Sequence, residues 1–333
     1  MTPKNSDPAP IVIAHRGASG LRPEHTLAAY DLAIEQGADF IEPDLVPTKD
    51  DVLVARHENA IADTTNVADH PEFAARRTSK TIDGQTITGW FVEDFTLAEL
   101  KTLRAKERLP KLRPANTAYD GRFEIPTLAE IIALAKRRSA ETGRTIGIYP
   151  ETKHPTYFAG IGHPTDVKLV AELREAGWDS AAAPVFIQSF EVKNLQRLHT
   201  ITKIRLIQLI DGEGGPADGA QPSYAAMITP VGLKAVAAFA YGIGPNKTML
   251  WAGAKPSPLV ANAHAAGLRV HPWTYRAENM FEPDRFRRGA DPAAHGDIAA
   301  EIDAGLAQGI DGFFTDFPLY GAQARDRLRA GVK

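Results

Sequence analysis

Short apolar and β-branched runs recur along this chain of 333 residues, with helical patterns between them. Regular alternation of strand and helix predicts parallel strands, because each helix returns the chain to the starting edge of the sheet. Eight such runs favour a closed (β/α)8 barrel, or TIM barrel, over an open doubly wound sheet. The predicted strands are residues 11–14, 40–45, 146–149, 185–188, 204–209, 248–251, 269–273 and 312–315.

The segments between these runs have the apolar spacing of helices. Several of them stop at a glycine, the residue that most readily adopts the left-handed conformation at a helix C-terminus. These glycines are Gly37, Gly143, Gly177, Gly242, Gly267 and Gly309. The predicted helices are residues 26–36, 128–142, 166–176, 192–198, 231–241, 258–266 and 298–308.

Length and composition favour one large domain. With 44% hydrophobic residues the chain can bury a large core, and a single barrel with insertions commonly takes this much sequence. We expect a flexible Pro-rich lead over residues 1–10 and a barrel domain over 11–330. Residues 58–126 are too many for an ordinary loop, so they predict an insertion after the second strand that covers the barrel mouth. A smaller insertion at 278–297 is expected at the same end.

Charge and composition restrict the partners. A net charge of −3 provides no basic field for nucleic acid or an anionic membrane, and no apolar run is long enough for a transmembrane helix. The absence of cysteine excludes disulfides and Cys-based metal or redox sites. Residues 1–6 lack an apolar signal core, which taken literally predicts a cytosolic protein. The polar lead also resembles the mature end of an exported protein, so a periplasmic or secreted location is preferred.

Chemically informative residues lie where predicted strands end, which is where the active sites of α/β barrels are found. Glu42 and Asp44 are two residues apart, so in an extended segment both side chains point to the same side and can bind one hard cation. Glu151, at the end of the third strand, completes a set of three carboxylates. Oxygen-only ligands suit Ca²⁺ or Mg²⁺, and Mn²⁺ less well, whereas zinc favours nitrogen and sulfur.

Two histidines are candidates for proton transfer. His15 ends the first strand and His57 follows another apolar run, so one imidazole can take a proton from the attacking oxygen while the other protonates the leaving alkoxide. Arg16 and Lys153 can bind phosphate oxygens, or can simply neutralise the carboxylates. Phe190 and Trp273 are candidates for an apolar wall beside the substrate.

These motifs resemble the glycerophosphodiester phosphodiesterase family, and the resemblance runs from residue 11 to about residue 320. The matching motifs are His15-Arg16-Gly17-Ala18-Ser19-Gly20, Pro23-Glu24, Glu42-x-Asp44, His57, Glu151-x-Lys153, Gln188-Ser189-Phe190, Trp273-Thr274 and Thr315-Asp316-x-Pro318. The long insertion after His57 resembles that of the bacterial periplasmic branch, which is often calcium-dependent. The chain departs from the family at Glu58, where Asp is common.

The resemblance implies a metal-dependent hydrolysis of glycerophosphodiesters to glycerol 3-phosphate and an alcohol. It implies that His15 and His57 carry the acid/base chemistry and that Arg16 and Lys153 hold the phosphate. It also implies that Glu42, Asp44 and Glu151 bind one divalent cation, with Ca²⁺ preferred over Mg²⁺ or Mn²⁺. The sequence carries no signal for the oligomeric state.

Two other functions are compatible with a barrel of this kind. A lipid-headgroup phosphodiesterase, similar to sphingomyelinase D or phospholipase C, would need an exposed apolar rim, for which only Trp90-Phe91 in the insertion is a candidate. A non-catalytic barrel that binds glycerophosphodiesters would be expected to lack a catalytic histidine or a metal carboxylate. Both histidines and all three carboxylates are present, which favours the enzyme.

Overall fold

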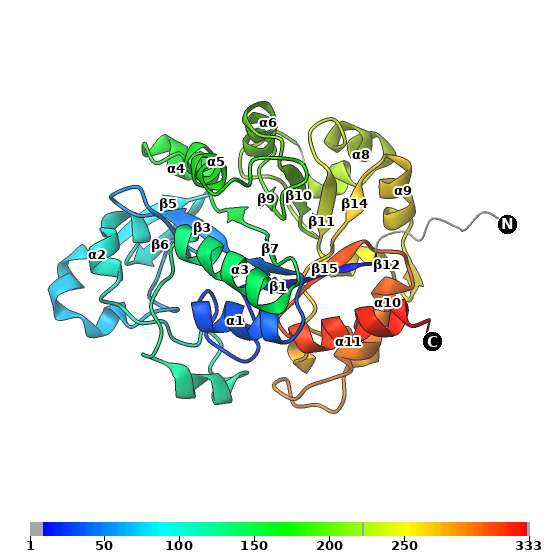
Figure 1. Cartoon of the computed structure of the whole chain (residues 1–333), viewed down its shortest axis with the longest axis horizontal. Helices are drawn as coiled ribbons and strands as arrows, with labels where there is room; N and C mark the ends of the chain where they lie inside the picture. The colour runs from blue at the N-terminus through cyan, green and yellow to red at the C-terminus, as the bar shows by residue number, and fades with distance from the viewer. Residues whose placement is uncertain (1–8, 222, 332–333) are drawn as a thin grey trace.

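The computed structural model describes residues 9–221 and 223–331. A ring of short parallel strands occupies the centre, and helices surround it (Figure 1). Most of the predicted flexible lead, residues 1–10, lies outside the described residues. The architecture confirms the predicted α/β barrel.

In the part of the chain that the structure describes, ten short strands make up the eight positions of the barrel. Two positions are interrupted by a proline, Pro43 between β2 and β3 and Pro150 between β7 and β8, because a proline has no N–H to donate to a ladder. The strands are β1 (Ile11–His15), β2 (Phe40–Glu42), β3 (Asp44–Pro47), β7 (Gly147–Ile148), β8 (Glu151–Thr152), β9 (Phe186–Ser189), β10 (Arg205–Ile210), β11 (Gly242–Pro245), β14 (Arg269–Val270) and β15 (Gly312–Thr315).

Two parallel ladders run around the barrel, in the orders β15-β1-β2-β7 and β14-β11-β10-β9-β8-β3. Individual backbone contacts join β14 to β15. Asp311 N donates to Val270 O at 2.9 Å, Phe314 N donates to Pro272 O at 3.0 Å, and Tyr275 bridges to Thr315 in parallel. These contacts bring the last two strand positions together.

Within the described residues, eight helices pack around the strands. Helix α3 occupies the predicted residues because a capping box of Thr127 and Glu130 begins it and Gly143, at φ 68°, ends it. The surrounding helices are α1 (Leu27–Glu35), α3 (Leu128–Thr142), α5 (Thr165–Glu175), α6 (Val192–Ile201), α8 (Pro230–Val236), α9 (Leu259–Ala265), α10 (Ile298–Leu306) and α11 (Pro318–Arg329). Shorter ones are α2 (Leu97–Leu100), α4 (Pro155–Gly160) and α7 (Tyr224–Met227).

The predicted sixth strand, residues 248–251, was wrong. Thr248 lies in a 3-10 helix, Lys247–Leu250, which the Asn246 side chain caps by accepting from Thr248 N. The sixth strand is β11, and the chain already pairs with β10 at Tyr241, whose N–H donates to Leu206 O at 2.8 Å. Gly242 therefore begins a strand and does not end a helix.

Small residues in β11 hid this strand from a search for apolar runs. A Cβ atom on Gly242 would lie 2.6 Å from Arg269 O, and one on Gly244 would lie 2.7 Å from the Leu209 side chain. The neighbouring strands therefore leave space for glycine only.

A tight hairpin immediately precedes the predicted insertion. Strand β3 pairs antiparallel with β4 (Leu53–Ala55), and Arg56 N donates to Asp44 O at 2.9 Å. This hairpin returns the chain to the level of Asp44, so that His57 enters the barrel mouth.

The rest of the insertion folds beside the barrel around a core of its own (Figure 1, cyan). This cluster also contains Val46 and Val54 of the β3–β4 hairpin and Phe158 of α4. The insertion therefore packs directly against these elements. Its remaining elements are β5 (Thr78–Ile82), β6 (Gln85–Gly89), α2 and the 3-10 helices Val67–Asp69, Pro71–Arg76, Val92–Asp94 and Pro114–Tyr119.

The predicted smaller insertion meets the long one. It holds the 3-10 helices Asn279–Phe281 and Asp284–Phe286, and Arg113 of the long insertion lies 2.5 Å from the Glu278 carboxylate. Two two-residue strands, β12 (Trp251–Ala252) and β13 (Lys255–Pro256), form a separate hairpin. Among the described helices, none combines the length and apolarity needed to cross a bilayer.

Replacing Gly242 by Ala tests the assignment of the sixth strand. The new Cβ has to displace the β14 backbone, so we expect a loss of about 1–3 kcal/mol in the free energy of unfolding, measured with urea. Gly160→Ala is the matched control, because nothing lies within 4 Å of a Cβ there. Equal stability of the two variants would contradict the close packing of β11.

Candidate functional site

A cavity of about 300 Å³ opens at the carboxyl ends of the strands. Every predicted site residue except Asp44 lines it. The lining residues are His15, Arg16, Glu42, His57, Glu151, Lys153, Gln188, Phe190, Leu209, Asp211, Trp273, Thr274, Arg276 and Phe314. Asp44 is buried beside the cavity, 3.4 Å from the Arg16 guanidinium.

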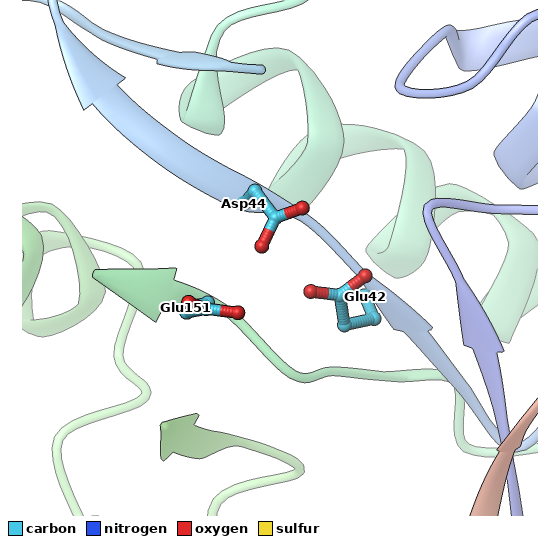
Figure 2. Close-up of side chains that lie close together, drawn as sticks. All are labelled: Glu42, Asp44 and Glu151. Atoms are coloured by element: carbon cyan, nitrogen blue, oxygen red, sulfur yellow. The ribbon is translucent and has the colours of Figure 1, made fainter. Parts of the chain in front are cut away.

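Three carboxylates converge at the second and third strand positions. Glu42 and Asp44 flank the break between β2 and β3, while Glu151 begins β8 and pairs with Asp44 across the ladder. Figure 2 shows the three side chains facing a common space. One oxygen of each lies within 4.8 Å of the others, which is the arrangement of a cation site made of oxygen ligands.

The carboxylates repel one another because all three are buried. Burial and the charges of Asp44 and Glu151 raise the pKa of Glu42 well above its usual range. Burial and the charge of Asp44 likewise raise the pKa of Glu151 to about 8, although Lys153 lies 3.0 Å away and opposes this. Without a cation, therefore, two of these groups favour the protonated form at neutral pH.

Asp44 stays ionised because a hydrogen bond and a nearby positive charge stabilise its carboxylate. His25 Nε2 lies 2.9 Å from its carboxylate, and the His25 bond together with Lys153 holds the pKa of Asp44 well below its usual range despite burial. His25 is itself fixed by the hydroxyl of Tyr30 at 2.7 Å. No role was predicted for His25 from sequence, because its position before a helix carries no signal for this contact.

Arg16 lines the cavity and contacts two of the three carboxylates. Its backbone N–H donates to Glu42 at 2.8 Å, and its guanidinium contacts Glu24 at 3.2 Å and Asp44 at 3.4 Å. The residue is held at φ 59°, a conformation that costs energy for a side chain of this size. Because the Glu24 carboxylate accepts from the guanidinium of Arg16, it orients that side chain. The cap of helix α1 is Thr26 and not Glu24.

Asp316, the residue after β15, holds His15 in place. His15 Nδ1 lies 2.6 Å from one carboxylate oxygen of Asp316, and Arg113 and Arg276 donate to the other at 2.6 and 2.9 Å. Arg113 comes from the insertion. The two guanidinium groups hold the pKa of Asp316 well below its usual range, so His15 faces a permanent negative charge.

Both candidate imidazoles are neutral in the free protein at pH 7. Burial and the charge of Arg16 lower the pKa of His15 to about 4, and burial, Arg16 and Lys153 lower that of His57 to about 3. His57 Nδ1 lies 3.0 Å from the Glu58 carboxylate. Each ring is thus paired with a carboxylate at Nδ1, and a neutral ring can accept a proton.

Aromatic rings bound the other side of the cavity. Phe190 packs edge-on against Trp273 at 5.6 Å, and Trp273 Nε1 donates to Gly244 O at 2.7 Å, which fixes the indole. The Lys153 ammonium lies 5.9 Å from the Phe190 ring. A second cavity of about 410 Å³ shares Glu151, Lys153, Phe190 and Asp211 with the first, so the two adjoin.

Two charged residues of the site, Arg113 and Arg276, were missed by sequence reasoning. Asp316 was recognised as a motif residue at the end of the eighth strand, but no role was predicted for it. Arg113 lies far from His15 in sequence, so only the folded insertion reveals their connection. His271, which directly follows β14, does not belong to the site. It is a buried core residue that shares a hydrogen bond of 2.8 Å with Tyr149.

Comparison with known proteins agrees with this geometry. A model of the glycerophosphoryl diester phosphodiesterase family matches residues 15–320. The chain is 38% identical to glycerophosphodiester phosphodiesterase GDPD6 of Arabidopsis thaliana, over 92% of this chain and 84% of that protein. It is 31% identical to a glycerophosphodiester phosphodiesterase of Haemophilus influenzae, over 94% of this chain and 89% of the relative.

Solved structures share the fold. A glycerophosphodiester phosphodiesterase from Agrobacterium tumefaciens superposes with a TM-score of 0.60 at 22% identity, covering 94% of this chain and 99% of that one. A phosphodiesterase from Oleispira antarctica, solved with the product sn-glycerol-3-phosphate, gives a TM-score of 0.63 at 20% identity, covering 96% and 97%. The motifs, the barrel and the relatives agree: this chain belongs to the glycerophosphoryl diester phosphodiesterase family.

Proposed function

We propose roles for these residues in the reaction that the enzyme catalyses, the hydrolysis of a glycerophosphodiester to glycerol 3-phosphate and an alcohol. The observation that carries the proposal is the meeting of two carboxylate-paired imidazoles and three buried carboxylates around one cavity. The product bound in the Oleispira antarctica relative supports a glycerol phosphate as the group retained in the site.

Glu42, Asp44 and Glu151 would hold one divalent cation. Their donor set fits, because it is made of oxygen only and because the mutual repulsion that raises two of the pKa values is relieved by a positive charge. Gln188 Oε1 is also buried without a hydrogen-bond partner among the described residues. When bound, the cation polarises a phosphoryl oxygen. We propose Ca²⁺ in preference to Mg²⁺ or Mn²⁺, because Ca²⁺ tolerates irregular carboxylate geometry.

His15 and His57 would carry the proton transfers. One neutral imidazole takes the proton of the attacking oxygen, and the other gives a proton to the leaving alkoxide. Besides burial, the charge of Arg16 lowers the pKa of both imidazoles and the charge of Lys153 lowers that of His57. The anionic phosphodiester offsets these charges and so favours protonation of the acid. Asp316 and Glu58 keep the two rings oriented with Nδ1 turned to a carboxylate.

Arg16 and Lys153 would bind the phosphate, and Phe190 with Trp273 would pack against the carbon skeleton. The two cations line the same cavity as the imidazoles. The adjoining cavity beyond Phe190 leaves space for the alcohol.

A lipid-headgroup activity lacks its predicted apolar rim, since Phe91 is fully buried and the indole of Trp90 donates to Phe73 O.

Removing either imidazole tests the central roles. We expect His15→Ala and His57→Ala to lower kcat for glycerophosphocholine by about 10²–10⁴-fold, because each ring supplies one proton transfer. Release of glycerol 3-phosphate measures the activity, and calorimetry with Ca²⁺ should show metal affinity close to that of the wild type. Full activity in either variant would refute the role of that histidine.

The raised pKa of Glu151 predicts that metal binding depends on pH. Because this carboxyl is protonated below about pH 8, a cation has to displace the proton, and affinity should rise between pH 6 and 8 by up to about tenfold per pH unit. Calorimetry in buffers of different ionisation enthalpy should detect the released proton. We expect Glu151→Gln to bind Ca²⁺ more weakly and to release fewer protons; affinity that does not change with pH would contradict the ligand assignment.

Asp316→Asn tests how much His15 depends on its partner. The variant keeps the shape of the side chain but removes the charge opposite the ring, so we expect kcat to fall roughly ten- to a hundredfold with little change in Ca²⁺ affinity. The control is Asp303→Asn, which breaks an exposed pair with Arg327 away from the cavity. Wild-type turnover in Asp316→Asn would contradict the role.

A further inference from the structure

A chain of hydrogen-bonding groups runs from His57 to the insertion. The Glu58 carboxylate lies 3.0 Å from His57 Nδ1 and, through its other oxygen, 2.9 Å from His154 Nε2. His154 Nδ1 in turn lies 2.6 Å from the Asp83 carboxylate. Two carboxylates and two imidazoles therefore alternate, so that each group has a partner of complementary hydrogen-bonding character.

Asp83 reaches this position because of the local sequence. Asp83 and Gly84 form the two-residue turn between β5 and β6, with φ values of 48° and 81°. An Asp-Gly pair is the preferred sequence for a type I′ turn, whose backbone twist matches that of the flanking strands. The hairpin is regular over its five residue pairs, and its tip thus presents Asp83 to the barrel.

His154 adopts a left-handed backbone conformation, which is uncommon for a residue other than glycine. It follows β8 at φ 43°, in the left-handed region, immediately before the proline that begins α4. Although burial lowers it, the bonds to Asp83 and Glu58 raise the pKa of His154 to about 9, so the ring is cationic at pH 7. A cation at this point keeps Glu58 ionised beside His57.

We propose that His154 and Asp83 are positioning residues for His57, acting through Glu58, so that the hairpin of the insertion completes the acid/base site. The inference rests on the proposed role of His57 and extends it to a part of the chain outside the barrel. Glu58 fits this arrangement because its side chain bridges two rings. The insertion then contributes to turnover.

Two variants are designed to remove the outer members of this chain while keeping the fold. Asp83→Asn suits the type I′ turn as well as Asp does, so the hairpin is retained while the charge is lost. His154→Gln keeps a donor of similar reach but no positive charge. We expect each to lower kcat for glycerophosphocholine by roughly tenfold or more, with KM changed less than about twofold. Asp83→Glu, which restores the charge, should recover part of the loss.

His163→Asn is the matched control. His163 lies 2.5 Å from Asp51 in another His–Asp pair, which connects the segment after α4 to the β3–β4 turn and does not line either cavity of the site. It should leave kcat unchanged. Thermal unfolding of all variants checks that losses of activity are not losses of folded protein.

Double variants show whether the effect passes through His57. In a His57→Ala background, assayed at high enzyme concentration, Asp83→Asn and His154→Gln should cause no further loss, because the ring they position is gone. Full additivity of the losses would mean that the two residues act elsewhere and would overturn the proposal. So would wild-type kcat in both single variants. Full activity of His57→Ala alone would instead overturn the proposed function, which separates the two failures.

Discussion

Three carboxylates buried within 4.8 Å of one another are the arrangement on which the rest of the site depends. In a low-dielectric interior such a group is stable only with protons, cationic neighbours or a metal ion. The chain supplies Arg16, Lys153 and a hydrogen bond from His25, and these still leave the pKa values of Glu42 and Glu151 raised. Arg16 also lowers the pKa values of both imidazoles, and Lys153 lowers that of His57. The proposed metal site and the proposed proton-transfer groups therefore share charged neighbours.

The insertion extends this coupling beyond the barrel. Through Arg113 it contacts Asp316, the partner of His15, and through Arg108 it contacts Glu24, the partner of Arg16, at 2.9 Å. Its β5–β6 hairpin contacts His154. Each of these contacts reaches a residue that adjoins a side chain of the proposed site or its partner, which gives a physical reason for so long a segment between the second and third strand positions.

Much of this could be predicted from sequence, because strand–helix alternation and polar residues at strand ends reflect local patterns. Those patterns placed Glu42, Glu151 and Lys153 correctly at one end of the barrel. The sixth strand was misplaced because Gly242 and Gly244 carry no apolar side chain that a search for apolar runs could detect. Glycine is needed at both positions because the neighbouring strands leave no space for a side chain. The roles of Asp316 and Asp83 were not predictable, because each depends on a contact between segments far apart in the chain. The Asp-Gly turn was a usable signal for the hairpin itself.

The most direct test of this account is the release of glycerol 3-phosphate from glycerophosphocholine by metal-stripped protein, before and after adding Ca²⁺, Mg²⁺ or Mn²⁺ separately. If the three carboxylates hold a catalytic cation, release should be negligible without metal and should return on addition, most strongly with Ca²⁺. Undiminished release by stripped protein would contradict the metal site, and no release with any of the three ions would contradict the assigned reaction.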